Sequence, residues 1–87
     1  MKIAVWDTYV QKPDNTFMHF DILVPDSISD KEQIVNYGNA YLNSKALSLK
    51  ISSTDHCAFC HVETPDAHTL EHVKNNGFAI LEMENCH

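Results

Sequence analysis

Residues 3–24 read IAVWDTYVQKPDNTFMHFDILV and contain two strand patterns around one turn. Residues 2–11 are rich in β-branched and aromatic side chains, which favour extended backbone. In the turn at residues 12–16, Pro13 fixes φ, and the Asp and Asn that follow tolerate tight or left-handed geometry. Residues 17–24 form the second strand pattern, which Pro25 ends. The stretch therefore predicts an N-terminal β-hairpin.

A helix is predicted directly after this hairpin. Ser29 and Glu32 match a capping box, with Ser29 as the N-cap. The residues that follow place a stripe at helical spacing, formed by Ile34, Tyr37, Gly38, Tyr41 and Leu42. We expect this helix to end near residues 43–44.

A strand, a helix and a last strand are predicted in the second half of the chain. Residues 46–52 alternate apolar and polar side chains, the period of a half-exposed strand. We expect residues 53–64 to form a loop. The second helix would then begin with Thr64 as its cap and Pro65 in its first turn, and would end at Gly77. Residues 78–84 alternate again and predict the last strand.

The resulting β-β-α-β-α-β order predicts an α+β fold in a single domain over residues 1–87. A chain of 87 residues can build one hydrophobic core. We expect a four-stranded mixed sheet with both helices on one face, which would leave the other face open to water or to a partner.

The composition restricts the classes of partner and the compartment. The chain has 12 acidic residues against 6 lysines, no arginine, and a net charge of −6. Phosphate backbones repel such a protein, so we expect no nucleic acid partner. No stretch approaches the roughly 20 apolar residues of a membrane span, and Asp7 interrupts the N-terminal run before a signal-peptide core could form. We therefore expect a cytoplasmic protein with reduced thiols and no membrane contact.

The hexapeptide His56-Cys57-Ala58-Phe59-Cys60-His61 concentrates the reactive side chains of the chain. Its C-x-x-C spacing could place two thiolates on one tetrahedral ion. If the predicted third and fourth strands were parallel, a right-handed crossover would bring Cys86 and His87 to the rim that carries the hexapeptide. The leading hypothesis is a zinc-like metal site with a structural or interaction role, formed by Cys57, Cys60, His61 and Cys86.

Two other interpretations of the hexapeptide stay open. Cys57 and Cys60 could act as a redox dithiol or sensor, although the predicted helix begins several residues later and its dipole would act weakly on the thiols. Alternatively, the cysteines are small buried side chains of a protein-interaction module. Such a module would use the uncovered sheet face to bind a protein partner or a second copy of the chain.

Two further groups of side chains carry metal-ligating or acid–base chemistry. His68 and His72 are four residues apart on the predicted second helix, a spacing that can chelate a divalent ion, and we expect them on a solvated face. Asp7, His19 and Asp21 lie on the hairpin strands, where a histidine beside a carboxylate is the start of an acid–base pair. Alternating polar residues are also expected on the wet face of a hairpin. No nucleophile flanks these three residues, so the sequence does not favour an enzyme.

Several segments, in order along the whole chain, resemble a known family. They are Met1–Val10, Met18–Asp21, Cys57–His61, Asn76–Phe78 and Met83–Cys86. Together they resemble a family of small bacterial proteins, the domain of unknown function DUF2024. The resemblance implies a compact α/β domain from bacteria and implies no activity. It also implies that the cysteines and His61 belong to one pattern, although Asn85 stands where Gly is expected and His87 where Asn is expected.

Overall fold

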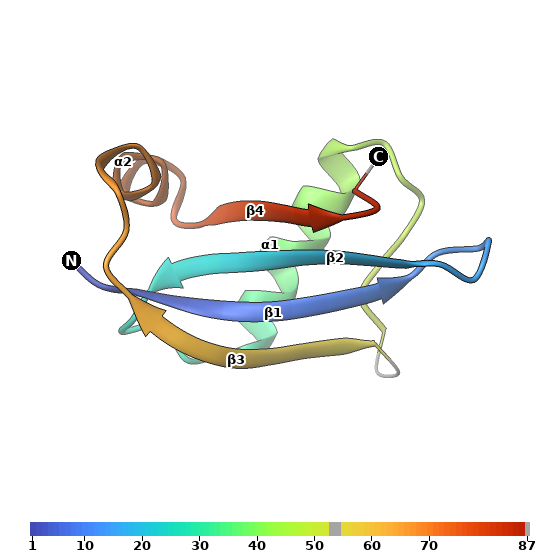
Figure 1. The fold of residues 1–87 in the computed structure, drawn as a ribbon, viewed down its shortest axis with the longest axis horizontal. Helices are drawn as coiled ribbons and strands as arrows, with labels where there is room; N and C mark the ends of the chain where they lie inside the picture. Colours follow the sequence, from blue (N-terminus) through green and yellow to red (C-terminus); the bar gives the residue numbers. More distant parts are fainter. Residues whose placement is uncertain (53–54, 87) are drawn as a thin grey trace.

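The N-terminal hairpin forms the centre of a four-stranded sheet in the computed structural model, which describes residues 1–52 and 55–86 (Figure 1). β1 (Ile3–Gln11) pairs antiparallel with β2 (Phe17–Pro25) along its whole length. In the turn between them, the Lys12 backbone N–H donates to the Thr16 carbonyl at 2.8 Å. Asn15 adopts a φ of 70° there, a left-handed conformation that asparagine tolerates.

β3 (His56–Glu63) and β4 (Ala79–Glu84) are the two edge strands. The strand order in the sheet is β3-β1-β2-β4, and every neighbouring pair is antiparallel. The predicted element order and the four-stranded sheet with two helices are therefore confirmed. The expected mixed sheet is wrong, because β3 and β4 lie at opposite edges and each pairs only with an antiparallel strand of the hairpin.

The predicted strand at residues 46–52 is not part of the sheet. Its apolar residues Leu47, Leu49 and Ile51 pack against the core, so the alternation correctly reports which side chains are partly buried. The segment lies beside the first helix, where the Ile51 backbone N–H donates to the Asn39 side chain at 2.8 Å. Alternating burial predicts an extended backbone but does not specify whether a strand lies alongside to pair with it.

The third strand is instead the region that contains the hexapeptide, which we expected to be a loop. Cys57 and Phe59 pair with Thr8 and Trp6 of β1. The register then shifts so that His61 pairs with Val5, which leaves Cys60 as an extra residue in a β-bulge. With that one residue set aside, polar His61 and Glu63 alternate with apolar Phe59 and Val62, and only Ala58 breaks the alternation that a half-exposed strand requires.

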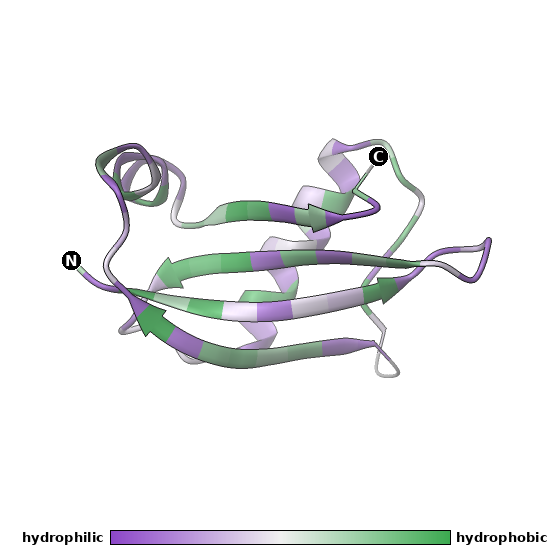
Figure 2. Cartoon of the chain, viewed as in Figure 1, coloured by the Kyte–Doolittle hydropathy of each residue, from purple (hydrophilic) through white to green (hydrophobic). Residues whose placement is uncertain are grey.

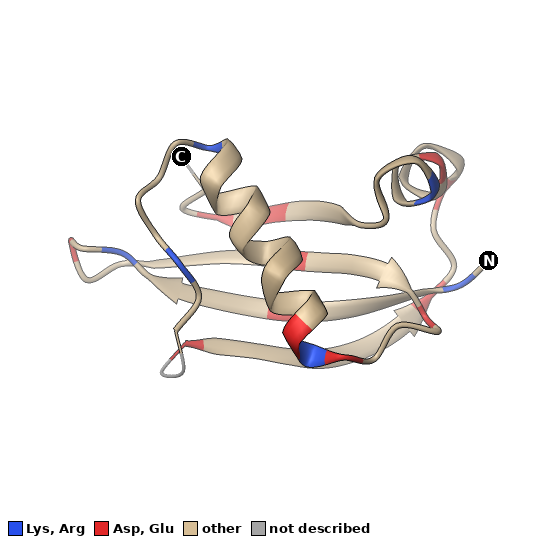
Figure 3. Cartoon of the chain, turned by 180° about the vertical axis from the view of Figure 1, so that it is seen from behind, with Lys and Arg blue, Asp and Glu red and all other residues tan. Residues whose placement is uncertain are grey.

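α1 (Lys31–Ser44) covers one face of the sheet. Asp30, not the predicted Ser29, is its N-cap and accepts from the Glu32 backbone N–H at 3.1 Å. The side chains buried in this layer come from α1 and from all four strands or their ends; they include Ile34, Leu42, Phe20, Ile22, Val10, Cys57 and Cys86. Figure 3 shows that the helix carries no Lys, Arg, Asp or Glu after Glu32.

α2 (Ala67–Asn76) packs at one end of the opposite face. Its N-cap is Asp66, which accepts from the Thr69 backbone N–H at 2.7 Å, rather than the predicted Thr64. The helix ends at Gly77 as predicted, in a left-handed conformation with φ 86°. Its buried Val73 packs against a second cluster, formed by Ile3, Val5, Leu23 and Ala79.

The two helices therefore bury opposite faces of the sheet, and the expectation that both lie on one face is wrong. Ala4 and Trp6 of β1 belong to the α1 layer, while Ile3 and Val5 between them belong to the α2 cluster. Because side chains alternate along a strand, these sets point in opposite directions. Figure 1 shows α2 only at the end where β1 begins, so most of the second face is uncovered.

The second face beyond α2, which we call the open face, is where polar residues interrupt the apolar strands. Figure 2 shows hydrophilic positions in the middle of β1 and β2, which are otherwise hydrophobic.

No helix among the described residues is long and apolar enough to cross a membrane.

The contact between α1 and residues 46–52 can be tested at Gly38. A Cβ at this position would lie 2.5 Å from Ile51 Cδ1 and 3.0 Å from Ile22 Cδ1. We expect Gly38→Ala to lower the free energy of unfolding by about 1 kcal/mol, because overpacking exceeds the gain in helix propensity. In an Ile51→Val background the nearer Cδ1 is gone and only the 3.0 Å approach to Ile22 Cδ1 remains, so the same change should cost less. Urea unfolding of the four proteins measures the coupling, which we expect to exceed about 0.5 kcal/mol; strictly additive effects would contradict this contact.

Candidate functional site

The register of the hairpin gathers three ionisable side chains on the open face. Asp7 of β1 pairs with Asp21 of β2, and Tyr9 pairs with His19. His19 is therefore the diagonal neighbour of Asp7 and lies two residues before Asp21 on the same strand and face. The two central strands thus place one imidazole beside two carboxylates.

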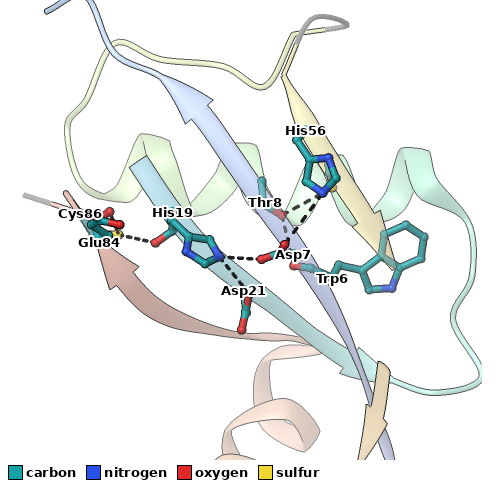
Figure 4. Close-up of polar contacts among 9 residues, drawn as sticks. Trp6, Asp7, Thr8, His19, Asp21, His56, Glu84 and Cys86 are labelled. Atoms are coloured by element: carbon teal, nitrogen blue, oxygen red, sulfur yellow. Dashed lines mark hydrogen bonds and ion pairs between the residues drawn. The ribbon is translucent and has the colours of Figure 1, made fainter. Parts of the chain in front are cut away.

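These three side chains approach within ligand distance of one another (Figure 4). His19 Nε2 lies 2.5 Å from Asp7 Oδ1 and 3.7 Å from Asp21 Oδ1. The side chains of His19 and Asp21 are only 17% and 15% exposed, and that of Asp7 is 30% exposed. Within residues 1–52 and 55–86, this is the one group of three or more His, Cys, Asp or Glu side chains whose ligand atoms all lie within 4.8 Å.

Two aromatic rings surround the cluster. Tyr9 stacks on His19 with ring centroids 4.1 Å apart and an interplanar angle of 11°. On its other side, Tyr9 meets His56 of β3 edge-on at 5.7 Å. His56 Nε2 lies 3.9 Å from Asp7 Oδ2, so a second imidazole borders the cluster. The packing of the His19 and His56 imidazoles against Tyr9 restricts the orientations of these two imidazoles.

Residues at the end of the chain form hydrogen bonds with the backbone of β2, the strand that carries His19. Cys86 is buried in the α1 layer, and its thiol donates to the His19 carbonyl at 3.2 Å. The neighbouring Asn85 donates its amide N–H to the Phe17 carbonyl at 2.9 Å, and Lys12 donates to the Asn85 carbonyl at 3.3 Å. The backbone around His19 is therefore fixed on the side opposite its imidazole.

Burial and like charge perturb two groups of the cluster. Burial raises the pKa of Asp21 above its ordinary value of 3.8, the Asp7 carboxylate raises it further, and His19 opposes the shift. Burial also raises the pKa of Tyr9, with additional contributions from the negative charges of Asp7 and Asp21. Both shifts follow from acidic groups held close together on a partly covered surface.

The four side chains predicted as metal ligands are not brought together. Cys57 is buried in the α1 layer, where it accepts a hydrogen bond from Thr8 Oγ1 at 3.6 Å. Cys60 is exposed at the bulge, and the exposed His61 contacts Glu63 at 3.2 Å. Cys86 follows β4, three strands away from β3 in the sheet and so roughly 14 Å across.

The expected convergence of Cys86 on the hexapeptide is therefore wrong. It depended on parallel pairing of the third and fourth strands, whereas the structure places these strands at opposite edges. His87, which we expected at the same rim, lies outside the described residues. The described members of the predicted set contribute no group of three ligand atoms within 4.8 Å of one another.

The strand conformation also bears on the redox interpretation of the C-x-x-C pair. Residues three apart in an extended strand are separated by about 10 Å, whereas disulfide Cα atoms lie about 4.4–6.8 Å apart. Cys57 is buried and Cys60 is exposed, and both are free thiols. Forming a disulfide between them would require β3 to distort around the bulge.

Sequence reasoning identified Asp7, His19 and Asp21 but gave them too little weight. Alternating polar residues are expected on any half-exposed hairpin, and only the register shows that these three meet. The sequence does contain a signal: ionisable residues interrupt both apolar strands of the hairpin, at positions that pair with each other when a short turn joins the strands. His68 and His72 lie exposed on α2, as expected.

Comparison with known proteins places the chain in a family. The family model described as "Domain of unknown function (DUF2024)" matches residues 1–83. The chain belongs to this family. The resemblance seen in the sequence is therefore confirmed, although the family description gives no activity.

A solved structure supports the fold. The NMR structure of protein NE1680 from Nitrosomonas europaea is 32% identical in sequence and superposes with a TM-score of 0.85. The similarity covers 100% of both chains. A search of curated proteins returned no match.

The placement of the three thiols predicts selective reactivity. In the folded protein we expect iodoacetamide to modify Cys60 rapidly, while Cys57 and Cys86 react only after unfolding, because both are buried. Intact-mass measurements should show one modified thiol in buffer and three in urea. The Cys60→Ser variant should show none in buffer. Modification of Cys57 at the rate of Cys60 would contradict the strand assignment.

The raised pKa of Asp21 predicts a pH dependence of stability in the metal-free protein. The folded chain retains the Asp21 proton at pH values where the unfolded chain has lost it. The free energy of unfolding should therefore fall as the pH rises from about 4 through this raised pKa. Asp21→Asn should remove this decline and stabilise the protein at pH 7 by less than about 1 kcal/mol, because solvent access screens the effect.

This pH dependence is measured by urea unfolding between pH 4 and pH 8 with a chelator present. The exposed Asp26 provides the control, and its Asn variant should keep the wild-type pH profile. A variant at Asp21 that is less stable than wild type at pH 7 would contradict the assigned repulsion.

Proposed function

We propose that this DUF2024 protein binds a divalent metal ion on the open face of its sheet, through Asp7, His19 and Asp21. The observation that carries the proposal is the approach of these three ligand atoms within 4.8 Å of one another. A tetrahedral zinc ion with bonds of about 2.0–2.2 Å holds its ligand atoms roughly 3.3–3.6 Å apart. The His19–Asp7 and His19–Asp21 separations of 2.5 Å and 3.7 Å lie on either side of that range, and the Asp7–Asp21 separation is at most 4.8 Å, so shifts of about 1 Å would admit the ion.

The chemistry of the donors supports a transition metal. One imidazole nitrogen and two carboxylates form a mixed N/O set, which suits zinc, iron or manganese. Burial and the neighbouring Asp7 carboxylate raise the pKa of Asp21, so its anion is disfavoured without a cation beside it. A divalent cation would neutralise both charges at once.

The position of the ligands supports a binding role for the ion. All three belong to the β1–β2 hairpin, which is already paired along its length, so the ion is not needed to form it. The remaining coordination positions would point away from the sheet, on the face that α2 leaves uncovered. We therefore retain the zinc-like ion and the interaction role expected from the sequence, with the ligands moved from the cysteines to the hairpin.

Isothermal titration of untagged, metal-stripped protein with zinc tests this function. We expect one ion per chain, and we expect His19→Ala and Asp7→Asn each to weaken binding at least about tenfold, because each removes a ligand. The matched control is Asp26→Asn, which removes an exposed carboxylate outside the cluster and should leave the affinity unchanged.

The paired histidines of α2 provide a second control. His68 and His72 are exposed and could bind added zinc weakly at their four-residue spacing. A double variant, His68→Ala with His72→Ala, should keep the main binding event. Loss of zinc binding in this double variant, together with its retention in His19→Ala, would overturn the proposed site.

A further inference from the structure

We infer that His56 of β3 is the fourth ligand of this ion, an inference that rests on the proposed metal site. Asp7 lies between two imidazoles: its Oδ1 is 2.5 Å from His19 Nε2, and its Oδ2 is 3.9 Å from His56 Nε2. The 3.9 Å separation from Asp7 Oδ2 is close to the roughly 3.3–3.6 Å expected between ligand atoms around tetrahedral zinc. His56 is not among the ligand atoms that all lie within 4.8 Å of one another, so this half-exposed side chain must rotate toward His19 and Asp21 to bind the ion.

The register of the sheet produces this arrangement symmetrically. Tyr9 pairs with His19 on one neighbouring strand and with His56 on the other. Both histidines are therefore diagonal neighbours of Asp7 on the open face. The Tyr9 ring lies between the two strands that carry these histidines and contacts both imidazoles, at 4.1 Å and 5.7 Å between centroids.

Hydrogen bonds of Asp55 fix the start of β3, next to His56, against the end of β1. The Asp55 carboxylate accepts from the Gln11 backbone N–H at 3.2 Å through Oδ1, and from the Ser52 backbone N–H at 2.9 Å through Oδ2. These bonds tie the residue before His56 to the end of β1. The backbone of His56 is therefore held in register with Tyr9 before any ion binds.

With His56, the ligand set becomes two imidazoles and two carboxylates from three strands. Four such donors suit a tetrahedral zinc ion. The bound ion would connect the edge strand β3 to the central hairpin, and β3 carries the exposed thiol of Cys60. Metal binding would therefore reduce the local opening of β3 and slow the exchange of its amides.

Zinc titration of untagged protein, with His56→Ala beside His61→Ala, tests the fourth ligand. The two histidines form a matched pair, because both lie on β3 and their side chains are 53% and 51% exposed. We expect His56→Ala to weaken zinc binding at least about tenfold. We expect His61→Ala to change it less than about threefold, because His61 acts on Asp21 through its charge but does not belong to the ligand cluster. In the wild-type protein, zinc should shift the imidazole nitrogen resonances of His56 and His19 in NMR spectra, and should slow amide exchange in β3.

The outcomes separate this inference from the function on which it rests. If zinc binds the wild-type protein and is lost in His19→Ala, but binds His56→Ala with unchanged affinity, the fourth ligand is wrong and the three-ligand site stands. If zinc does not bind the wild-type protein, or binds only through His68 and His72, both are wrong. Thermal unfolding in chelator checks that the His56→Ala and His61→Ala variants are equally folded.

Discussion

The antiparallel pairing of β1 with β2 is the constraint on which the rest of this structure depends. It places Asp7 opposite Asp21 and Tyr9 opposite His19, and it directs these side chains away from α1. The same pairing directs Phe20, Ile22 and Val10 toward α1, where they form the main core. A shift of one residue would exchange the two faces, burying the ionisable residues and exposing the apolar ones. The large cost of that exchange fixes both the fold and the candidate site.

The hexapeptide acquires a different meaning once it is a strand. Alternation along β3 separates its side chains, so that Cys57 joins the α1 layer and His56 joins the open face. The thiols and imidazoles that are adjacent in sequence therefore serve different surfaces. Thr8 and Cys57 form a buried polar contact within the core, whereas His56 faces the carboxylate of Asp7. The proposed metal chemistry uses one histidine of the motif and neither of its cysteines.

The last residues of the chain return to the hairpin and not to the hexapeptide. Cys86 donates to the backbone of His19 and lies beside the hydroxyl of Tyr41. Tyr41 in turn donates to Glu82 at 2.5 Å, and Lys45 contacts the same carboxylate at 2.7 Å. Burial raises the pKa of the Tyr41 hydroxyl, and Glu82 and Cys86 add to that shift. The described end of the chain thus anchors β4, α1 and the strand that carries the candidate ligands.

Local sequence by itself determined the hairpin, both helices, the last strand and the element order, because these depend on turn residues, caps and short-range periodicity. It also identified His19 with its two aspartates, and it identified His56 as part of a reactive hexapeptide. Only the tertiary structure decided which segment entered the sheet: residues 46–52 alternate but stay outside it, whereas residues 56–63, with their bulge, pair with β1, and the choice depends on a distant partner strand. The tertiary structure also decided the strand order and direction: β3 pairs with β1, which brings His56 to Asp7, and β4 pairs with β2, which keeps Cys86 three strands away from β3.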